Sequence, residues 1–263
     1  MTQNFTQVEH DGLSFRCCVD RAGDSAPWIV FSNSMMTDLT IWDAQADTLR
    51  GRFNILRYDQ RGHGGTTPPS GPCDFDQLGG DLLALLDHFG IASCTFVGLS
   101  MGTPTGLYLA INHPERVTRL VFSDGQSATA KNGAATWQAR IDSARAEGME
   151  AVAKDTMSRW FSEASQRAGK TEKPYAAAAA TSLDGYIACA TALQNYDFNA
   201  GLPGIQVPTL LMAGANDGNM PVSMQEIRKA IPGAVMHVIP DAGHIPNHEQ
   251  PEIFNARLLE FLG

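Results

Sequence analysis

The sequence predicts an α/β fold: a mostly parallel central sheet covered by helices on both faces, with an inserted helical cap. Three observations support this prediction. Short apolar runs alternate with amphipathic segments along most of the chain, as in folds built from strand, helix and strand units. A long central stretch shows helical patterns only. The chain has 263 residues, 43% of them hydrophobic, which is enough for one large core with an insertion.

Six apolar runs are predicted to be strands. Each is brief, rich in Val, Ile, Phe and Leu, and followed by turn residues, which is typical of strands buried on both faces of a parallel sheet. In chain order they are PWIVFS (27–32), FNILRYD (53–59), CTFVGLS (94–100), RLVFSD (119–124), PTLLMAG (208–214) and AVMHVIP (234–240). In parallel sheets of this kind, functional groups gather at the carboxyl ends of the strands.

Amphipathic segments between these runs predict helices that pack on the sheet. Residues 76–90, 102–117 and 221–231 place apolar side chains at intervals of three and four, which is the period of one helix face. Since strands alternate with helices, the strands are expected to run parallel and to be joined by crossovers on both faces of the sheet.

The middle of the chain breaks this alternation. From about Gln126 to Leu202 no strand pattern occurs, and residues 137–164 and 173–197 have helical patterns. The alanine run at 176–180 is a strong helix former. We therefore predict three segments: a first part of the core (1–125), a helical cap (126–202) and a second part of the core (203–263).

Composition excludes several classes of function. A net charge of -9 offers no basic field for a nucleic-acid backbone, so no nucleic acid is expected as a partner. The sequence has neither a basic leader with an apolar run nor about 18 consecutive apolar residues, which predicts a cytoplasmic protein without a membrane partner. The five cysteines lack metal-ligand spacing and are expected to be buried, reduced thiols. The oligomeric state is not predicted.

The motif FVGLSMGTPTG carries the most specific chemistry. It contains Gly-x-Ser-x-Gly directly after a predicted strand and at the start of a predicted helix, which is the pattern of a nucleophile elbow. Gly98 and Gly102 permit the tight turn, and Ser100 projects from it. At the start of a helix, Ser100 also lies where backbone N–H groups stabilise developing negative charge.

A nucleophilic serine needs a base. His244 is the preferred candidate because it lies in the loop that follows the last strand and precedes the final helix, and His248 is the fallback. The other five histidines are interpreted as structural or solvent-exposed: His10, His63, His88, His113 and His237.

The base needs an acid to orient it. Asp217 lies in the loop past the strand at 208–214, and Asp124 ends the strand before the cap. Both are candidates. Asp217 is preferred because Ser100, Asp217 and His244 follow the order serine, acid, histidine that accompanies such an elbow.

Seven segments carry a resemblance to a known family: PWIVFSNSMMTDLTIWD, LRYDQRGHG, GLSMG, SRWF, GYIACATALQNYD, PGIQVPTLLMAG and AGHIPNHE. On these segments the sequence resembles an α/β-hydrolase and, over nearly its whole length, is similar to the 3-oxoadipate enol-lactonases of aromatic catabolism. Two departures border the acyl site. Thr103 and Pro104 follow GLSMG where the family usually has a further glycine, and SNSMM stands where the family has SNSLG.

The resemblance implies an oxyanion hole made of two backbone N–H groups. Met101, directly after the nucleophile, supplies one. Ser34 is expected to supply the other, with Met35 next, because SNS replaces the His-Gly pair that many such hydrolases carry in this loop. The side chains of Met35 and Met36 are expected to line an adaptable apolar pocket, with a place in the core as the alternative.

The cap is expected to select the substrate. Trp137 and Arg140 are three residues apart on one helix face, and the lactonases carry a similarly spaced pair. An arginine binds a carboxylate with two parallel hydrogen bonds, and a lactone with an acetate arm offers one. The alternative is a solvent-exposed arginine. Trp160 is interpreted as a core residue, and Asp59 and Arg61 as structural groups of their loop.

The sequence thus predicts a serine hydrolase that opens a carboxylated enol-lactone through an acyl-enzyme on Ser100. It needs no metal and no organic cofactor, and its partner is a small lactone or ester. A carboxylesterase, or a hydrolase of another lactone or an amide, would share every triad residue. A hydrolase of carbon–carbon bonds and a ligand-binding receptor on the same scaffold are further alternatives.

Overall fold

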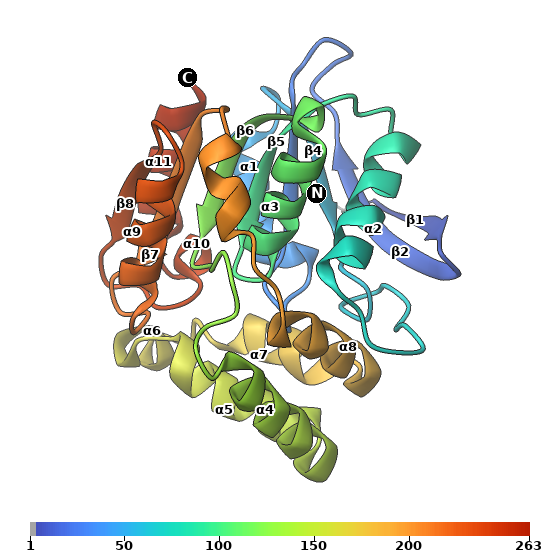
Figure 1. Ribbon diagram of the computed structural model, residues 1–263, viewed down its shortest axis with the longest axis vertical. Coiled ribbons are helices and arrows are strands. Elements are labelled where there is room, and N and C mark those ends of the chain that lie inside the picture. Colours follow the sequence, from blue (N-terminus) through green and yellow to red (C-terminus); the bar gives the residue numbers. More distant parts are fainter. Residues whose placement is uncertain (1–3) are drawn as a thin grey trace.

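The computed structural model describes residues 4–263 and has at its centre an eight-stranded sheet (Figure 1). The strand order is β1-β2-β4-β3-β5-β6-β7-β8, and pairing is parallel except for β1 with β2 and β2 with β4. The predicted α/β class with a mostly parallel sheet is therefore confirmed. The strands are β1 (Phe5–His10), β2 (Leu13–Asp20), β3 (Trp28–Ser32), β4 (Asn54–Tyr58), β5 (Cys94–Leu99), β6 (Val117–Ser123), β7 (Thr209–Gly214) and β8 (Val235–Ile239).

All six predicted strands are present, and two more were not predicted. β1 and β2 form a hairpin in which His10 pairs with Leu13 across the two-residue loop of Asp11 and Gly12. Both loop residues have positive φ angles, 50° and 72°, as a type I′ turn requires. The Asp-Gly pair, a dipeptide typical of two-residue hairpin turns, is the sequence signal that would have revealed this hairpin.

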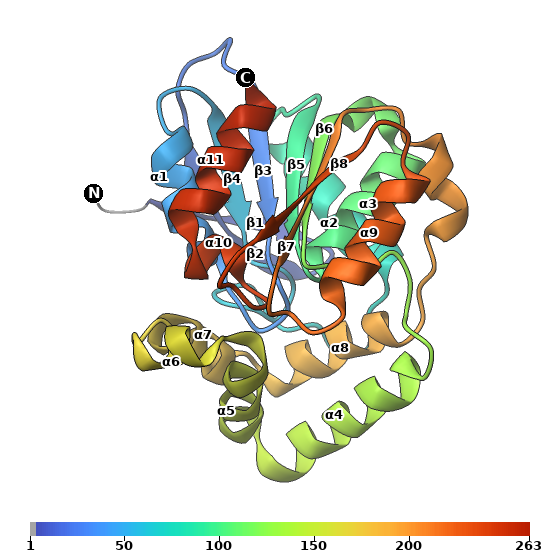
Figure 2. The ribbon, with the colours of Figure 1, turned by 90° about the vertical axis from the view of Figure 1, so that its left-hand side faces the viewer.

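Helices cover both faces of the sheet (Figure 2). On one face α1 and α11 pack over Phe31 and Ile55, and on the other α2, α3 and α9 pack over Val30 and Phe96. The predicted helix 102–117 ends early, because Pro114 cannot continue it. The elements of these layers are η1 (Leu39–Trp42), α1 (Asp43–Leu49), α2 (Phe75–His88), α3 (Gly102–Asn112), η2 (Pro114–Arg116), η3 (Asn199–Gly204), α9 (Met220–Ala230), α10 (Pro246–Glu249) and α11 (Pro251–Leu262).

Five further helices form a separate layer beside the carboxyl ends of the strands (Figures 1 and 2). They lie between β6 and β7, inside the segment 126–202 that the sequence assigns to the cap, and we call them the cap. Gly148, at φ 81°, separates the first two, and the alanine run lies in the fourth. The cap helices are α4 (Gly133–Glu147), α5 (Met149–Trp160), α6 (Glu163–Arg167), α7 (Glu172–Ala180) and α8 (Leu183–Gln194).

The cap rests on the core at a few close contacts. Gly62 of the core and Gly185 of α8 approach so closely that a Cβ added to Gly62 would lie 2.2 Å from the Cα of Gly185. The hydroxyl of Ser182 donates a hydrogen bond of 3.2 Å to the carbonyl oxygen of Gly62. The two glycines therefore let the loop of the core and the first turn of α8 meet backbone to backbone.

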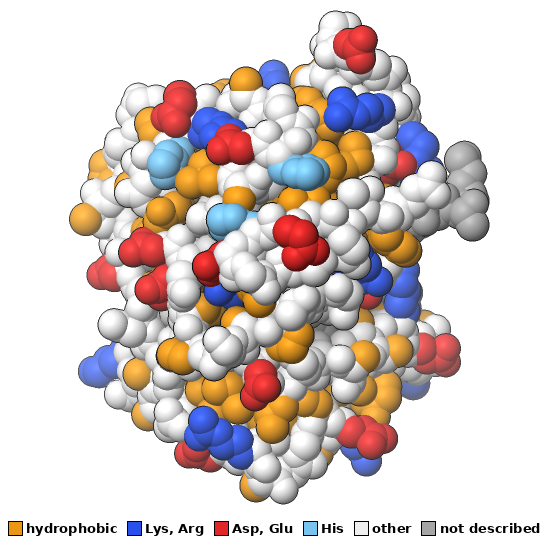
Figure 3. Space-filling model, turned by 90° about the vertical axis from the view of Figure 1, so that its right-hand side faces the viewer, with side chains coloured by type: hydrophobic (Ala, Val, Ile, Leu, Met, Phe, Trp, Pro, Cys, Tyr) orange, Lys and Arg blue, Asp and Glu red, His pale blue; other side chains and the backbone are white. Residues whose placement is uncertain are grey.

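The surface and interior show several general features. On the face seen in Figure 3, acidic and basic side chains are interspersed. All five cysteines are buried free thiols, as predicted. Within residues 4–263 no single helix is both long and apolar enough to cross a membrane; α7 and α8 are long and apolar enough only when taken together, and they meet at an angle of 97°.

Candidate active site

Ser100 lies on a strained turn between β5 and α3. Its φ angle is 53°, in the left-handed region that residues other than glycine rarely occupy. A Cβ added at Gly98 would lie 2.4 Å from the carbonyl oxygen of Gly102, and one added at Gly102 would lie 2.4 Å from that of Ser32. Both glycines are therefore required by close backbone contacts. The backbone N–H of Ser100 donates to the carbonyl oxygen of Ser123, at 2.8 Å, which ties the turn to β6.

His244 is hydrogen-bonded to both Ser100 and Asp217. Its Nε2 lies 2.9 Å from the Oγ of Ser100, and its Nδ1 lies 2.7 Å from an Oδ of Asp217. The three residues follow β5, β7 and β8, so the sheet brings together side chains far apart in the sequence. The arrangement has the geometry of a nucleophile, a base and an orienting acid.

Asp217 is held as a carboxylate. Burial acts to raise the pKa of this group, but the charge of His244 and hydrogen bonds from His244 and Asp124 outweigh it, so its pKa lies below the usual value. The main chain also positions it: the backbone N–H of Asn216 donates to the carbonyl oxygen of Ala242, at 2.8 Å. The loop of the acid is thereby joined to the loop of the histidine.

Asp124, the rival acid, lies beside Asp217 rather than against His244. It is fully buried at the end of β6, and it accepts hydrogen bonds from the backbone N–H of Gly214 at 2.8 Å and from the hydroxyl of Ser123 at 2.6 Å. Burial, followed by the negative charge of Asp217, raises its pKa well above the usual value. The structure therefore brings Asp124 to the site in a different position from the one that an orienting acid occupies.

Two other histidines occupy structural positions. The Nε2 of His248, the fallback base, donates to the carbonyl oxygen of Lys170 at 2.8 Å and makes no hydrogen bond to Ser100. His63 is fully buried, and its Nδ1 donates to the carbonyl oxygen of Arg61 at 3.0 Å. Burial lowers the pKa of His63 to about 4, so it is neutral near pH 7.

The groups proposed for the oxyanion hole lie beside Ser100. Within residues 4–263, the backbone N–H groups of Met101 and Ser34 donate to no protein acceptor, and the same holds for Met35. The side chain of Asn33, by contrast, is fixed by a hydrogen bond to the carbonyl oxygen of Tyr58 at 2.9 Å. Three backbone N–H groups without a protein acceptor, those of Ser34, Met35 and Met101, therefore belong to residues that line the cavity beside Ser100.

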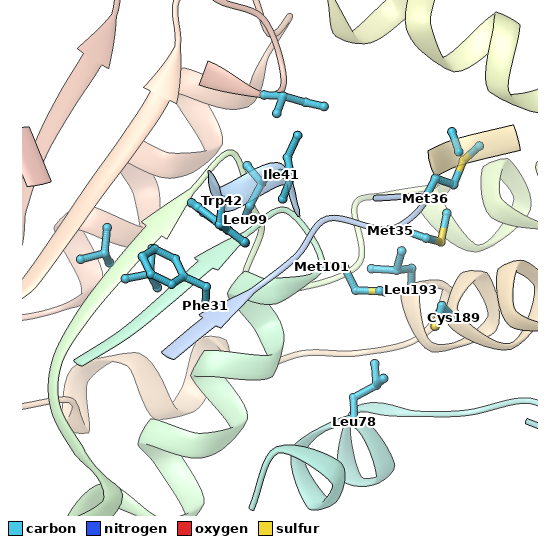
Figure 4. Packing of buried hydrophobic residues seen from close by; sticks show 14 of the residues in the cluster. Phe31, Met35, Met36, Ile41, Trp42, Leu78, Leu99, Met101, Cys189 and Leu193 are labelled. Carbon is cyan, nitrogen blue, oxygen red and sulfur yellow. The ribbon is translucent and has the colours of Figure 1, made fainter. Parts of the chain in front are cut away.

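A cavity of about 340 Å³ separates these loops from the cap. Met35, Met36, Met101 and Leu193 line its apolar wall, and Figure 4 shows Met35 and Met101 close to Leu193 of α8. Met36 is held at φ 63°, with the hydroxyl of Thr156 3.8 Å from its sulfur. The two methionines therefore lie in the wall of the cavity as well as in the core.

Trp137 and Arg140 line the same cavity from α4. The Arg140 guanidinium lies over the Trp137 ring, 4.6 Å from its centre, and it is half-buried. Among the described residues no carboxylate forms an ion pair with Arg140. Burial and the nearby charge of Arg159 lower the pKa of Arg140. The cavity thus contains a guanidinium whose charge no protein carboxylate neutralises at short range.

Sequence reasoning missed that Arg159 and Trp160, the last residues of α5, line the cavity. Arg159 lines the cavity near Arg140, and it also contacts Asp155 at 3.0 Å and Thr156 at 3.1 Å. Trp160 is half-buried in the cavity wall, its ring 5.1 Å from that of His244. Trp160 packs against the hydrophobic core, as interpreted from the sequence, and it lines the cavity as well. The carbonyl oxygen of Trp160 accepts a hydrogen bond from the backbone N–H of His244 at 2.8 Å, a contact between residues far apart in the chain that no local sequence signal reveals.

The remaining predicted structural groups are buried. Asp59 accepts hydrogen bonds from Arg16, Leu39 and Gly65, and Arg61 binds Asp81 with two hydrogen bonds of 2.6 and 2.7 Å. Neither contacts the triad. In the part of the chain that the structure describes, no three His, Cys, Asp or Glu side chains converge in a group that could hold a metal ion.

Comparison with known proteins places this geometry among hydrolases. A family described as alpha/beta hydrolase fold matches residues 27–251. The 3-oxoadipate enol-lactonase 2 of Acinetobacter baylyi is 38% identical over 233 residues, which cover 87% of this chain and 86% of that protein.

Two solved structures are similar over nearly the whole chain. The enol-lactonase from Burkholderia xenovorans LB400 superposes with a TM-score of 0.92 at 35% identity, covering 98% of this chain and 99% of that one. A hydrolase from Pseudomonas aeruginosa PA01 gives a TM-score of 0.93, also at 35% identity, and covers 99% of this chain and 98% of that one.

Proposed function

The chain belongs to the α/β-hydrolase family, and from that premise we propose that it is a serine hydrolase that opens a carboxylated enol-lactone, such as 3-oxoadipate enol-lactone. Two relatives are named as enol-lactonases, one of them a 3-oxoadipate enol-lactonase, and they are 38% and 35% identical to this chain where they align with it. The observation that carries the proposal is the pair of hydrogen bonds from His244, 2.9 Å to Ser100 and 2.7 Å to Asp217, at the floor of a cavity that contains two arginines.

In the first half of the reaction, Ser100 attacks the lactone carbonyl carbon while the Nε2 of His244 takes the hydroxyl proton. Asp217 accepts the hydrogen bond of Nδ1–H and stabilises the imidazolium that forms. The ring C–O bond then breaks. The leaving oxygen departs as an enolate, takes the proton from His244, and the enol becomes a ketone. An acyl-enzyme on Ser100 remains.

In the second half, water attacks the acyl-enzyme as His244 removes its proton. The tetrahedral intermediate expels Ser100, which regains its proton from His244, and the free acid leaves. In both halves the negative charge on the carbonyl oxygen is stabilised by the backbone N–H groups of Met101 and Ser34, with Met35 as the alternative second donor. These donors are expected to be free because no protein acceptor occupies them.

The cap supplies the specificity. Arg140 is proposed to bind the carboxylate of the substrate, because a half-buried guanidinium without a carboxylate partner favours an anionic ligand. Arg159 and the hydroxyl of Tyr186 border the same part of the cavity and add further donors. Trp137 holds the Arg140 guanidinium by a cation–π contact, and the methionines cover the apolar part of the ring.

The decisive experiment is hydrolysis of 3-oxoadipate enol-lactone beside neutral lactones and short neutral esters, with wild type and Ser100→Ala. The wild type is expected to prefer the carboxylated lactone, and Ser100→Ala is expected to lose about three or more orders of magnitude in rate. Ser158→Ala, an exposed serine on α5, is the matched control and is expected to match wild type.

Two outcomes would contradict the proposal. Retention of most activity by Ser100→Ala would exclude Ser100 as the nucleophile. Equal kcat/KM for carboxylated and neutral substrates would favour the carboxylesterase alternative, and hydrolysis of none of the substrates, together with no labelling of Ser100 by a fluorophosphonate, would favour a ligand-binding protein.

A further inference from the structure

Asp124 lies where three loops of the site meet. Its own backbone N–H donates to the carbonyl oxygen of Met212 in β7, at 3.1 Å, and the preceding residue, Ser123, accepts from the backbone N–H of Ser100. Its side chain accepts from the backbone N–H of Gly214, where the loop of Asp217 begins. Ser123 and Asp124 together therefore connect the turn of the nucleophile to the turn of the acid.

The Asp124 carboxyl group has no cationic partner. Its exposed fraction is 0%, and within residues 4–263 no Lys, Arg or His side chain forms an ion pair with it. Its remaining neighbour is the carboxyl group of Asp217, with which it shares a hydrogen bond. A hydrogen bond between two carboxyl groups needs a proton on one of them, and two adjacent buried carboxylates repel each other strongly.

The surroundings decide which group carries that proton. Asp217 is partly exposed, at 15%, and its other contact is the Nδ1–H of His244. Asp124 is wholly removed from water, and its partners are a backbone N–H and a hydroxyl group. Because a carboxylate without water or a cation is costly, the proton is expected on Asp124 and the negative charge on Asp217.

We propose that Asp124 is a positioning residue: a neutral carboxylic acid that donates a hydrogen bond to Asp217 and holds that carboxylate against His244. This inference rests on the proposed triad of Ser100, Asp217 and His244. Sequence order alone left Asp124 as a competing candidate for the acid of the triad, and the proposal gives Asp124 a role of its own.

The pKa directions of the two groups agree with this arrangement. The pKa of Asp124 is raised, first by burial and then by the charge of Asp217, whereas the pKa of Asp217 is lowered by its hydrogen-bonding partners despite burial. These directions accompany the difference in burial and in contacts between the two groups, and that difference is what places the proton on Asp124.

The test compares Asp124→Asn with Asp124→Ala. Asparagine keeps a hydrogen-bond donor without a titratable group, so it is expected to rescue kcat to within about threefold of wild type. Alanine removes the donor, and kcat is expected to fall by about tenfold to a hundredfold, the cost of one hydrogen bond to a charged group, with little change in KM. Both variants are assayed on a neutral activated ester, so the result does not depend on the identity of the lactone.

Three further measurements keep the result interpretable. Asp81→Asn, a buried aspartate paired with Arg61 and remote from the triad, is the matched control: it is expected to lower stability without changing kcat of the folded protein. The far-downfield proton resonance of the Nδ1–H of His244 is expected in wild type and Asp124→Asn and to be shifted or lost in Asp124→Ala. Fluorophosphonate labelling of Ser100 in wild type tests the triad itself.

The outcomes separate the two proposals. If Ser100 is not labelled in wild type, the proposed function fails. If Ser100 is labelled and Asp124→Ala keeps the wild-type kcat, the positioning role is wrong. If Asp124→Ala does not fold, Asp124→Asn alone decides: a loss as large as that of Asp217→Asn would show that the carboxyl group itself is needed and would overturn the role of a hydrogen-bond donor.

Discussion

The loops at the ends of the strands and the cap that faces them are built in different ways. The loops are joined by main-chain hydrogen bonds, such as those from Ser100 to Ser123 and from Asn216 to Ala242, both of 2.8 Å. The cap offers side chains from helices that are largely exposed: in α4, which carries Trp137 and Arg140, only Ile141 and Ala144 are buried.

We infer from this difference that the loops carry the catalytic groups and that the cap determines which substrate binds. The main chain of a buried sheet holds its side chains in nearly fixed positions. This suits steps that form and break bonds, because such steps tolerate only small errors in the positions of the reacting groups. Long side chains on exposed helices are free to adjust to a ligand. We therefore expect substitutions in the loops to change kcat, and substitutions in the cap to change KM.

The largest effect is expected from Asp217→Asn. The amide cannot accept the hydrogen bond of His244 Nδ1–H as a carboxylate does, and it favours the wrong tautomer of the imidazole. We expect kcat to fall by about 10⁴-fold on any ester or lactone, measured by steady-state kinetics, with little change in KM.

Asp241→Asn is the matched control, because Asp241 is exposed in the same loop as His244 and asparagine tolerates its φ angle of 54°. It is expected to leave kcat unchanged. A rise in KM without a fall in kcat for Asp217→Asn would contradict the assignment of chemistry to the loops.

A second prediction concerns the loss of stability of the core at low pH. All seven histidines lie outside 126–202, and His63, in the core loop under α8, is buried and neutral with a pKa of about 4. The unfolded chain takes up a proton at His63 below about pH 6.5, while the folded protein does not until about pH 4. Stability from this group is therefore complete above about pH 6.5 and is lost as the pH falls toward 4, by about 3 kcal/mol in all.

The measurement is urea unfolding of wild type and His63→Gln at a series of pH values. Because glutamine does not titrate, the free energy of unfolding of the variant is expected to depend less steeply on pH in this window, by up to one proton. Parallel pH dependences for the two proteins would show that His63 is not the source of the acid sensitivity.

The smallest effect is expected from Arg140→Ala. Loss of a charge-assisted hydrogen bond to the substrate carboxylate should raise KM for the carboxylated lactone by about tenfold to a hundredfold and leave kcat and the KM of a neutral ester nearly unchanged. Arg145→Ala is the control on the same helix, because Arg145 is exposed and faces Asp142 at 3.9 Å. Equal changes in KM for both substrates would exclude a carboxylate site at Arg140.

Patterns of neighbouring residues were sufficient for most of the fold. Six strands, the cap helices and the helices predicted at 76–90, 102–117 and 221–231 follow from apolar periodicity, because burial of one or both faces of an element imposes a local repeat; α1, between β3 and β4, was not predicted. The turn at Ser100 follows from two glycines that backbone contacts require. The hairpin of β1 and β2 was missed, although its turn at Asp11 and Gly12 is a local signal.

The sequence by itself determined the α/β class, the elbow at Ser100 and a short set of histidines and aspartates, since each depends on residues that are close in the chain. Only the tertiary structure decided which of them meet. The order β5-β6-β7-β8 brings the ends of four strands side by side, so that His244 contacts Asp217 while Asp124 is enclosed behind it. The burial of Asp124, its protonation, and the places of Arg159 and Trp160 in the cavity wall all depend on residues far apart in the chain. No local sequence pattern contains that information.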